Sequence, residues 1–465
     1  MGLKEIKRGD HLLILSLGMH VPCFLDNFFK TRQLFNVMQK SGRISKEEQT
    51  LSEVLYKRHL SHLDHHSPWL LPSLNSPSPA PLSPHSLLFY TSLFLYHIHT
   101  LCFTVGAVGK KEEKNMRVSS SFLASLVLVL VFLVANGDPL VPAVIIFGDS
   151  VVDVGNNNNL NTLIKANFPP YGRDFVTHRP TGRFCNGKLA TDFTAEYLGF
   201  TSYPPAYLSR DARGNDLLTG ANFASAASGL YDRTANLYRA IPLTQQLNYY
   251  KEYQTKVVNT VGKAKANDIF AGAIHLLSAG SSDYIQNYYI NPMLNRVYTP
   301  DQFSDILIRS YSTFIQDLYG LGARRIGVTT LPPTGCLPAA ITLFGGGSNQ
   351  CVTRLNQDAV AFNKKLNNTS ESLLDKMPGL KLVVFDIYQP LLDMVMKPAD
   401  NGFFESRRAC CGTGTLETSL LCNDRSLGTC TNATSYVFWD GFHPSEAANQ
   451  VLAGNLLAQG VSLIS

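Results

Sequence analysis

The chain has 465 residues, of which 45% are hydrophobic and 16% are charged, so it is neither a disordered nor a supercharged protein. Its net charge of +5 lies in residues 1–137, which hold 14 Lys and Arg against 9 Asp and Glu. Residues 138–465 carry 26 of each and are neutral. A neutral main domain argues against a partner that is bound through a phosphate backbone, such as a nucleic acid.

Residues 116–137 have the composition of a secretory signal peptide. Met116 is followed by the largely apolar run Phe122–Val134 and then by small residues at both positions that a signal peptidase needs. The run is too short for a comfortable membrane span. Since a signal peptide should start a chain, we expect translation to begin at Met116. Residues 1–115 are then a disordered or untranslated extension. The alternative, a membrane anchor built from Leu87–Val108, stays open.

Within this extension, His59, His62 and His66 have the spacing of one helix face and could bind zinc. Only Asp64 joins them, so we expect an unstructured flank instead. We expect no metal and no cofactor in the main domain.

Seven of the nine cysteines lie in the main domain. Cys336 and Cys351 bracket a glycine-rich loop and make a plausible disulfide. Four more cysteines could form two further disulfides or a zinc site, and an exported protein favours disulfides: Cys410, Cys411, Cys422 and Cys430. Cys185 is the isolated candidate for a free thiol.

Three glycosylation sequons begin at Asn367, Asn368 and Asn432. Together with the signal peptide and the late cysteines they indicate a secreted, extracellular protein, located in the apoplast or cell wall if the source is a plant. No stable membrane partner is then expected once the signal is removed.

Residues 138–465 alternate short apolar runs with helical patterns. The expected strands are Val144–Phe147, Ala271–Ala279, Arg325–Thr330 and Lys381–Phe385. The expected helices are Lys188–Leu198, Asp301–Tyr319, Val352–Asp375 and Ser445–Leu457. This alternation predicts one α/β domain with a mostly parallel sheet between two layers of helices. Ligands bind such sheets at the C-terminal ends of the strands.

Two short segments carry candidate catalytic residues. Ser150 stands where the first expected strand ends, after Gly148, and could be a nucleophile, a helix cap or a turn residue. Asp440 and His443 are three residues apart in a turn before a helix, a spacing that lets the carboxylate reach the imidazole Nδ1–H. Together they make a Ser-Asp-His hydrolase triad. The α/β-hydrolase motif Gly-x-Ser-x-Gly is absent from the sequence.

The main domain resembles the plant GDSL esterase/lipase family of the SGNH hydrolase superfamily over about residues 140–460. Six blocks carry the resemblance, in order: FGDSVVDVGNNN, YGRDF with TGRFCNGK, GANFASAASG, SAGSSDY, LPPTGCLP and YVFWDGFHPSEAAN. The resemblance implies a three-layer, flavodoxin-like α/β/α fold. It also implies that Ser150 is the nucleophile, His443 the general base and acid, and Asp440 the residue that orients His443.

The resemblance implies an oxyanion hole made by the Ser150 N–H, a second backbone N–H at the position of Ala227, and a third donor at Ser282. The family has glycine at the second position, and Gly220 or Gly229 takes that role if the register differs. A donor at Ala227 survives the change from glycine at little cost if φ is negative there. At the third position the family has asparagine, and the hydroxyl of Ser282 donates one hydrogen bond but reaches less far.

Two functions from different classes follow. The first is a carboxylic-ester hydrolase that works through an acyl-enzyme on a small-molecule acyl ester. The resemblance suggests acyl lipids, cutin-like polyesters or acetylated sugars as substrates. The alternative is a non-catalytic secreted binding protein on the same fold, suggested by the serine at position 282. The sequence assigns no oligomeric state.

Overall fold

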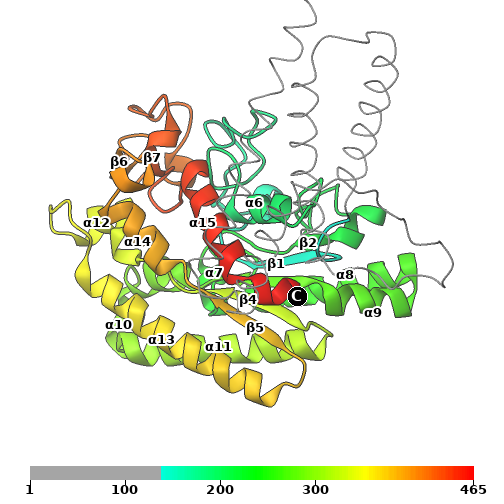
Figure 1. Cartoon of the computed structure of the whole chain (residues 1–465). Helices are drawn as coiled ribbons and strands as arrows, with labels where there is room; N and C mark the ends of the chain where they lie inside the picture. The colour runs from blue at the N-terminus through cyan, green and yellow to red at the C-terminus, as the bar shows by residue number, and fades with distance from the viewer. Residues whose placement is uncertain (1–137) are drawn as a thin grey trace, which may run out of the picture. The chain divides into compact units, whose positions relative to one another are not determined.

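The computed structural model describes residues 138–465, which are built around one parallel sheet (Figure 1). The strand order is β2-β1-β3-β4-β5, and every neighbouring pair is parallel. The strands are β1 (Val144–Gly148), β2 (Gly220–Asn222), β3 (Ile274–Ser278), β4 (Arg325–Thr329) and β5 (Lys381–Phe385). The predicted α/β class with a mostly parallel central sheet is therefore confirmed.

Several expectations concern residues 1–137, which lie outside the described residues. They are the extension 1–115, the signal peptide 116–137, the alternative anchor Leu87–Val108 and the histidines near His62. These stay predictions.

Helices cover both faces of the sheet, as the alternating side chains of β1 show. Ile145 and Phe147 belong to the larger core, and Val144 and Ile146 belong to a second core on the opposite face. The larger core is formed with α8 (Leu243–Val261), α11 (Pro300–Gly320) and α13 (Thr353–Lys376). The second is formed with α6 (Ala190–Tyr197), α15 (Glu446–Gln459) and α16 (Val461–Ile464). Figure 1 shows α11 and α13 side by side below the sheet.

The remaining α-helices and strands of residues 138–465 are five short helices and a second, two-stranded sheet. The helices are α7 (Asp232–Leu237), α9 (Lys263–Gly272), α10 (Pro292–Val297), α12 (Pro338–Phe344) and α14 (Tyr388–Met396). A second sheet pairs β6 (Glu405–Ala409) with β7 (Tyr436–Phe438) in parallel. Within residues 138–465, no helix is both long enough and apolar enough to cross a membrane.

Local sequence explains where two of the principal helices begin. Thr299 caps α11: its hydroxyl accepts a hydrogen bond from the Gln302 N–H, while the Gln302 side chain accepts from the Thr299 N–H. Pro300 occupies the first helical position, where a missing N–H costs nothing. Ser445 caps α15 by accepting from the Ala448 N–H. This second cap fixes where the helix that follows His443 starts.

All four predicted strands exist, with one shorter than expected. The predicted strand Ala271–Ala279 is shortened to β3 because its first residues end helix α9. The four predicted helices agree with α6, α11, α13 and α15 to within about two residues at each end. The sequence interpretation missed the short strand β2, the helices α8 and α9, and the β6–β7 pair.

Three disulfides join the cysteines of the main domain. They are Cys336–Cys351, Cys410–Cys430 and Cys411–Cys422, and Cys185 is a buried free thiol. The predicted Cys336–Cys351 disulfide and the predicted free thiol of Cys185 are confirmed. The zinc alternative is wrong, because all four late cysteines are bonded in pairs.

Candidate active site

Ser150 lies in the turn that follows β1, at the C-terminal edge of the sheet. Gly148 has a φ of 141°, and a Cβ there would collide with the carbonyl oxygen of Ser278 on β3. The Gln246 side chain of α8 accepts from the Gly148 N–H and donates to the Gly148 carbonyl, each at 2.9 Å. The turn that carries Ser150 is therefore fixed from β3 and from α8. The Ser150 side chain is buried, with 6% of its surface exposed.

The structure brings Ser150 together with His443 and Asp440. The Ser150 Oγ lies 2.7 Å from His443 Nε2, and His443 Nδ1 lies 2.7 Å from Asp440 Oδ1. The Trp439 N–H donates to the His443 carbonyl at 2.8 Å, which closes the turn that bears both residues. Because the carboxylate engages Nδ1, the ring presents Nε2 to the serine hydroxyl, as a general base must.

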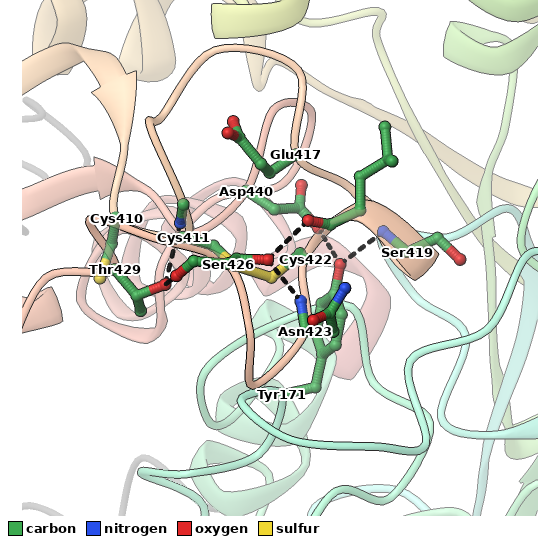
Figure 2. Close-up of a disulfide and its surroundings, with 12 residues drawn as sticks. Tyr171, Cys410, Cys411, Glu417, Ser419, Cys422, Asn423, Ser426, Thr429 and Asp440 are labelled. Carbon is green, nitrogen blue, oxygen red and sulfur yellow. Dashed lines mark hydrogen bonds between the residues drawn. A yellow bond between two sulfur atoms is a disulfide. The ribbon is translucent and has the colours of Figure 1, made fainter.

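Tyr171 completes this group and was not assigned a role from the sequence. Its hydroxyl donates to Asp440 Oδ2 at 2.7 Å, and Figure 2 shows it between Asp440 and Ser419. Tyr171 belongs to the YGRDF block, 269 residues before Asp440. The block was recognisable, but nothing in the local pattern identifies the partner of the tyrosine.

The loop after β2, which carries Ala227, is held by polar side chains from the turn that follows β1. Asn156 Nδ2 donates to the carbonyls of Asn222 and Ala224, at 2.9 and 2.7 Å. The Asp153 carboxylate accepts from the Ala226 N–H at 3.0 Å. Burial raises the pKa of Asp153 to about 6, and its backbone donors oppose the shift. The asparagine run thus anchors the candidate oxyanion loop.

The conformation at Ala227 corrects one expectation. Its φ is +66°, in the left-handed region, and not negative. A non-glycine residue there costs about 1–2 kcal/mol, so the exchange from glycine is not free of strain. The N–H groups of Ser150 and Ala227 donate to no residue of the described chain. Both are therefore free to bind an oxyanion, and Gly229 is less suited because it packs directly on the Asp283 carboxylate.

Ser282 follows β3 and is buried, at 3% exposure. Its hydroxyl has no hydrogen-bond partner among the described residues. The next residue, Asp283, accepts from the Leu230 N–H at 2.7 Å and the Thr234 hydroxyl at 2.6 Å. Asp283 thereby ties the Ser282 segment to the Ala227 loop. Burial raises the pKa of Asp283 to about 7, against these donors.

A further carboxylate adjoins Ser150 in the chain, that of Asp149. Burial raises the pKa of Asp149 to about 7, while the Val151 N–H and the charge of His443 lower it. Asp149 Oδ1 accepts from the Val151 N–H at 3.2 Å, which keeps the turn around Ser150 tight.

Other singled-out residues have structural roles or exposed positions. His275 is a buried core residue bonded to the Tyr250 hydroxyl, and burial lowers its pKa to about 4. The sequon residues Asn367 and Asn368 are exposed on α13, and Asn432 is exposed at a loop. The described part of the chain has no cluster of three potential metal ligands.

Comparison with known proteins identifies the family of this chain. The family model described as GDSL-like Lipase/Acylhydrolase matches residues 144–456. This chain belongs to the GDSL lipase/acylhydrolase family. Two GDSL esterase/lipases of Arabidopsis thaliana are 71% and 74% identical to it over 352 and 334 residues. These alignments cover 76% and 71% of this chain, and 100% and 94% of the relatives.

A third relative, the GDSL esterase/lipase APG of Arabidopsis thaliana, is 61% identical over 350 residues, covering 75% of this chain and 99% of its own. The expected plant GDSL family is therefore confirmed. The GDSL chain is a hydrolase of ester substrates, and the alternative of a non-catalytic binding protein is not supported.

The free hydroxyl of Ser282 leads to a prediction for this GDSL hydrolase. If it is an oxyanion donor, Ser282→Ala lowers kcat by about 10²–10³ with KM little changed, because the lost bond forms mainly in the transition state. Ser282→Asn then matches or exceeds the parent, since the amide restores the family's donor. Steady-state kinetics on one soluble ester decide this, with thermal melts as the folding control. A Ser282→Ala variant with full activity would leave the oxyanion to the two backbone N–H groups.

Proposed function

We propose that this protein hydrolyses carboxylic esters through an acyl-enzyme on Ser150, with His443 as general base and acid and Asp440 as its orienting carboxylate. The single observation that carries the proposal is the unbroken chain of 2.7 Å hydrogen bonds from Ser150 Oγ through the imidazole to Asp440. A serine hydroxyl is a weak nucleophile on its own, and an adjacent oriented base is what activates it.

The reaction follows from these positions. Ser150 Oγ attacks the ester carbonyl carbon while His443 Nε2 takes the hydroxyl proton. The negative charge that develops on the carbonyl oxygen is bound by the free N–H groups of Ser150 and Ala227 and by the Ser282 hydroxyl. The imidazolium, stabilised by Asp440, then protonates the leaving alcohol. Water, deprotonated by His443, releases the acid in a second cycle and restores the serine.

An apolar cavity adjoins the candidate site and has the chemistry of an acyl-chain pocket. Its volume is about 100 Å³, several times the roughly 10–15 Å³ that one water molecule requires. Val151 lines it directly after the nucleophile, and Phe442 and Pro444 line it on either side of His443. Its lining continues along β3, from Ser278 to Ile274, and reaches Leu463 near the C-terminus. We infer that it takes the alkyl chain of the acyl group.

Filling this cavity is expected to change chain-length preference without abolishing chemistry. Ala190, at the start of α6, lines the cavity, and Ala190→Phe places a ring in it. Hydrolysis of an acetyl ester is expected to stay within about twofold of the parent. For an octanoyl or longer ester, kcat/KM is expected to fall about tenfold or more, because several methylene groups lose their apolar contacts. A uniform loss across chain lengths would place the acyl chain elsewhere.

We also propose that the protein is exported and that residues 138–465 are the mature hydrolase domain. The composition of residues 116–137 supports this, and so do the three disulfides, which persist in oxidising compartments. The mature chain is expected to begin near Asp138 in N-terminal sequencing of secreted material. Recovery of any peptide from residues 1–115 in that material would contradict Met116 as the working start. Exposure of Asn367, Asn368 and Asn432 leaves these sequons accessible for glycosylation.

A further inference from the structure

The two oxygens of the Asp440 carboxylate have different surroundings. Oδ1 accepts from His443 Nδ1 at 2.7 Å and from the N–H groups of Phe442 and His443 at 2.9 Å each. Among residues 138–465, Oδ2 accepts from the Tyr171 hydroxyl alone, at 2.7 Å. Since Asp440 is fully buried, no solvent replaces that single donor. The negative charge on Oδ2 is therefore stabilised by a single side chain, that of Tyr171.

The direction of the Tyr171 proton is fixed by a second contact. The Ser419 N–H donates to the Tyr171 oxygen at 2.8 Å. An amide N–H can only donate, so the tyrosine must direct its own proton to Asp440. The ring is 1% exposed and packs edge-on against Trp439 and Phe184. Burial and the Asp440 carboxylate raise the pKa of Tyr171 well above its usual range, which keeps it a donor.

Ser419 belongs to a loop that a disulfide closes. The Cys411–Cys422 bond joins residues 11 positions apart, and Ser419 lies inside this ring (Figure 2). Ser419 has a φ of +53°. Its side-chain oxygen accepts from the Lys165 N–H at 2.9 Å. The ring and this anchor together set where the Ser419 N–H points.

The same loop is bonded to the chain on both sides of Asp440. The Cys411 N–H donates to the Trp439 carbonyl at 2.8 Å, and the Gly441 N–H donates to the Glu417 carbonyl at 2.9 Å. The loop thus holds the backbone that bears the carboxylate as well as the tyrosine that binds it.

We propose that Tyr171 is a positioning residue of the catalytic machinery, and that the disulfide-closed loop Cys411–Cys422 holds it against Asp440 through Ser419. The proposal rests on the triad proposed above. Tyr171 fixes the carboxylate plane and neutralises part of its charge, so that Oδ1 remains aligned with His443 Nδ1.

Other titratable groups face this arrangement and are common to all the variants below. His443 lowers the pKa of Asp149 by its charge, and Cys185 lies near enough to Tyr171 to raise the pKa of its hydroxyl. Arg173 lies over the Trp439 ring at 4.9 Å. Since none of these is changed, a difference in pH profile reports on Tyr171 and its loop.

The first test is Tyr171→Phe, which removes the hydroxyl and keeps the ring. We expect kcat to fall roughly 10- to 100-fold with KM little changed, as for a lost hydrogen bond to a charged group. Without the tyrosine hydroxyl, the full negative charge of Asp440 favours the protonated form of His443. The acid limb of the kcat/KM profile, where protonation of the base abolishes activity, is therefore expected to move to higher pH. The matched control is Tyr311→Phe, another buried tyrosine, whose hydroxyl bonds Ser370 within the α11–α13 packing. It should leave kcat and the acid limb unchanged.

The second test opens the loop with Cys411→Ala and Cys422→Ala together. The acid limb is expected to move in the same direction by less, and the pair should move it less in the Tyr171→Phe background than in the parent. Opening the remote Cys336–Cys351 bond by the same exchange is the control and should not move the limb. Additive effects would overturn the role of the loop.

The outcomes separate this proposal from the proposed function. A Tyr171→Phe variant with the parent's kcat and acid limb overturns the positioning role, while an inactive Ser150→Ala variant would leave the triad standing. If Tyr171→Phe does not fold, the loop-opened variant still decides: an unmoved acid limb overturns the proposal. The proton on His443 Nδ1 should give a downfield NMR resonance. A shift of this resonance in the loop-opened variant, and none when the Cys336–Cys351 bond is opened, supports the proposal.

Discussion

Ser150→Ala is expected to reduce ester hydrolysis by a factor on the order of 10⁶ in kcat while the protein remains folded. The Ser150 Oγ is the atom that His443 Nε2 contacts at 2.7 Å, so its removal leaves the base with nothing to activate. What remains is binding and the N–H donors, which supply only a residual rate. Initial rates on a soluble short-chain ester, with protein purified free of host esterases, measure this.

A remote serine provides the control for this substitution. Ser310 lies on α11, and within the described residues its hydroxyl donates only to the Ile306 carbonyl of its own helix. Ser310→Ala should keep the parent's rate and thermal melt. Turnover by Ser150→Ala equal to the parent would remove Ser150 as the nucleophile.

Asp440→Asn is expected to lower kcat by about 10⁴. The amide has no charge to stabilise the imidazolium that forms when Ser150 loses its proton. In the parent, Asp440 Oδ1 accepts three hydrogen bonds and Oδ2 accepts one, from the Tyr171 hydroxyl. The NH₂ group of asparagine must replace one of these oxygens, and it cannot accept a hydrogen bond. In either orientation the NH₂ group faces another hydrogen-bond donor, and the resulting repulsion moves His443 out of alignment.

The measurement is kcat on the same soluble ester across a pH series, with a thermal melt for each variant. Asp386→Asn is a suitable control, because this carboxylate caps the start of α14 far from His443 along the chain and should affect stability alone. An Asp440→Asn variant within tenfold of the parent would mean that another group orients His443.

Strands and helices with a clear local pattern of apolar residues could be predicted from the sequence. The strands with continuous apolar runs, such as Val144–Phe147, were found because central strands of a parallel sheet are buried on both faces. The strand Gly220–Asn222 was missed because three small or polar residues form no such run. Helix α8 was missed although its buried Leu243, Leu247 and Tyr250 recur at helical spacing, so the signal was present in the sequence.

The candidate site divides in the same way. Ser150 was identified by its place at a strand exit, and the Asp440–His443 pair by a spacing that is local in the chain. The positive φ of Ala227 could not be read from the residue, since alanine ordinarily has negative φ. The bond between Tyr171 and Asp440 joins residues 269 positions apart and depends on how two loops meet. Such contacts follow from the tertiary fold and have no signature in either segment.

The central claim is that the protein acts through a covalent bond to Ser150, and labelling with an organophosphate tests it most directly. The reagent forms a stable adduct with a serine that a neighbouring imidazole activates. Intact mass should show one adduct per chain as activity is lost, and peptide mapping should place it on Ser150. Ser150→Ala should take up none. Loss of activity with the adduct on another residue, or full labelling of Ser150 with activity retained, would contradict the account.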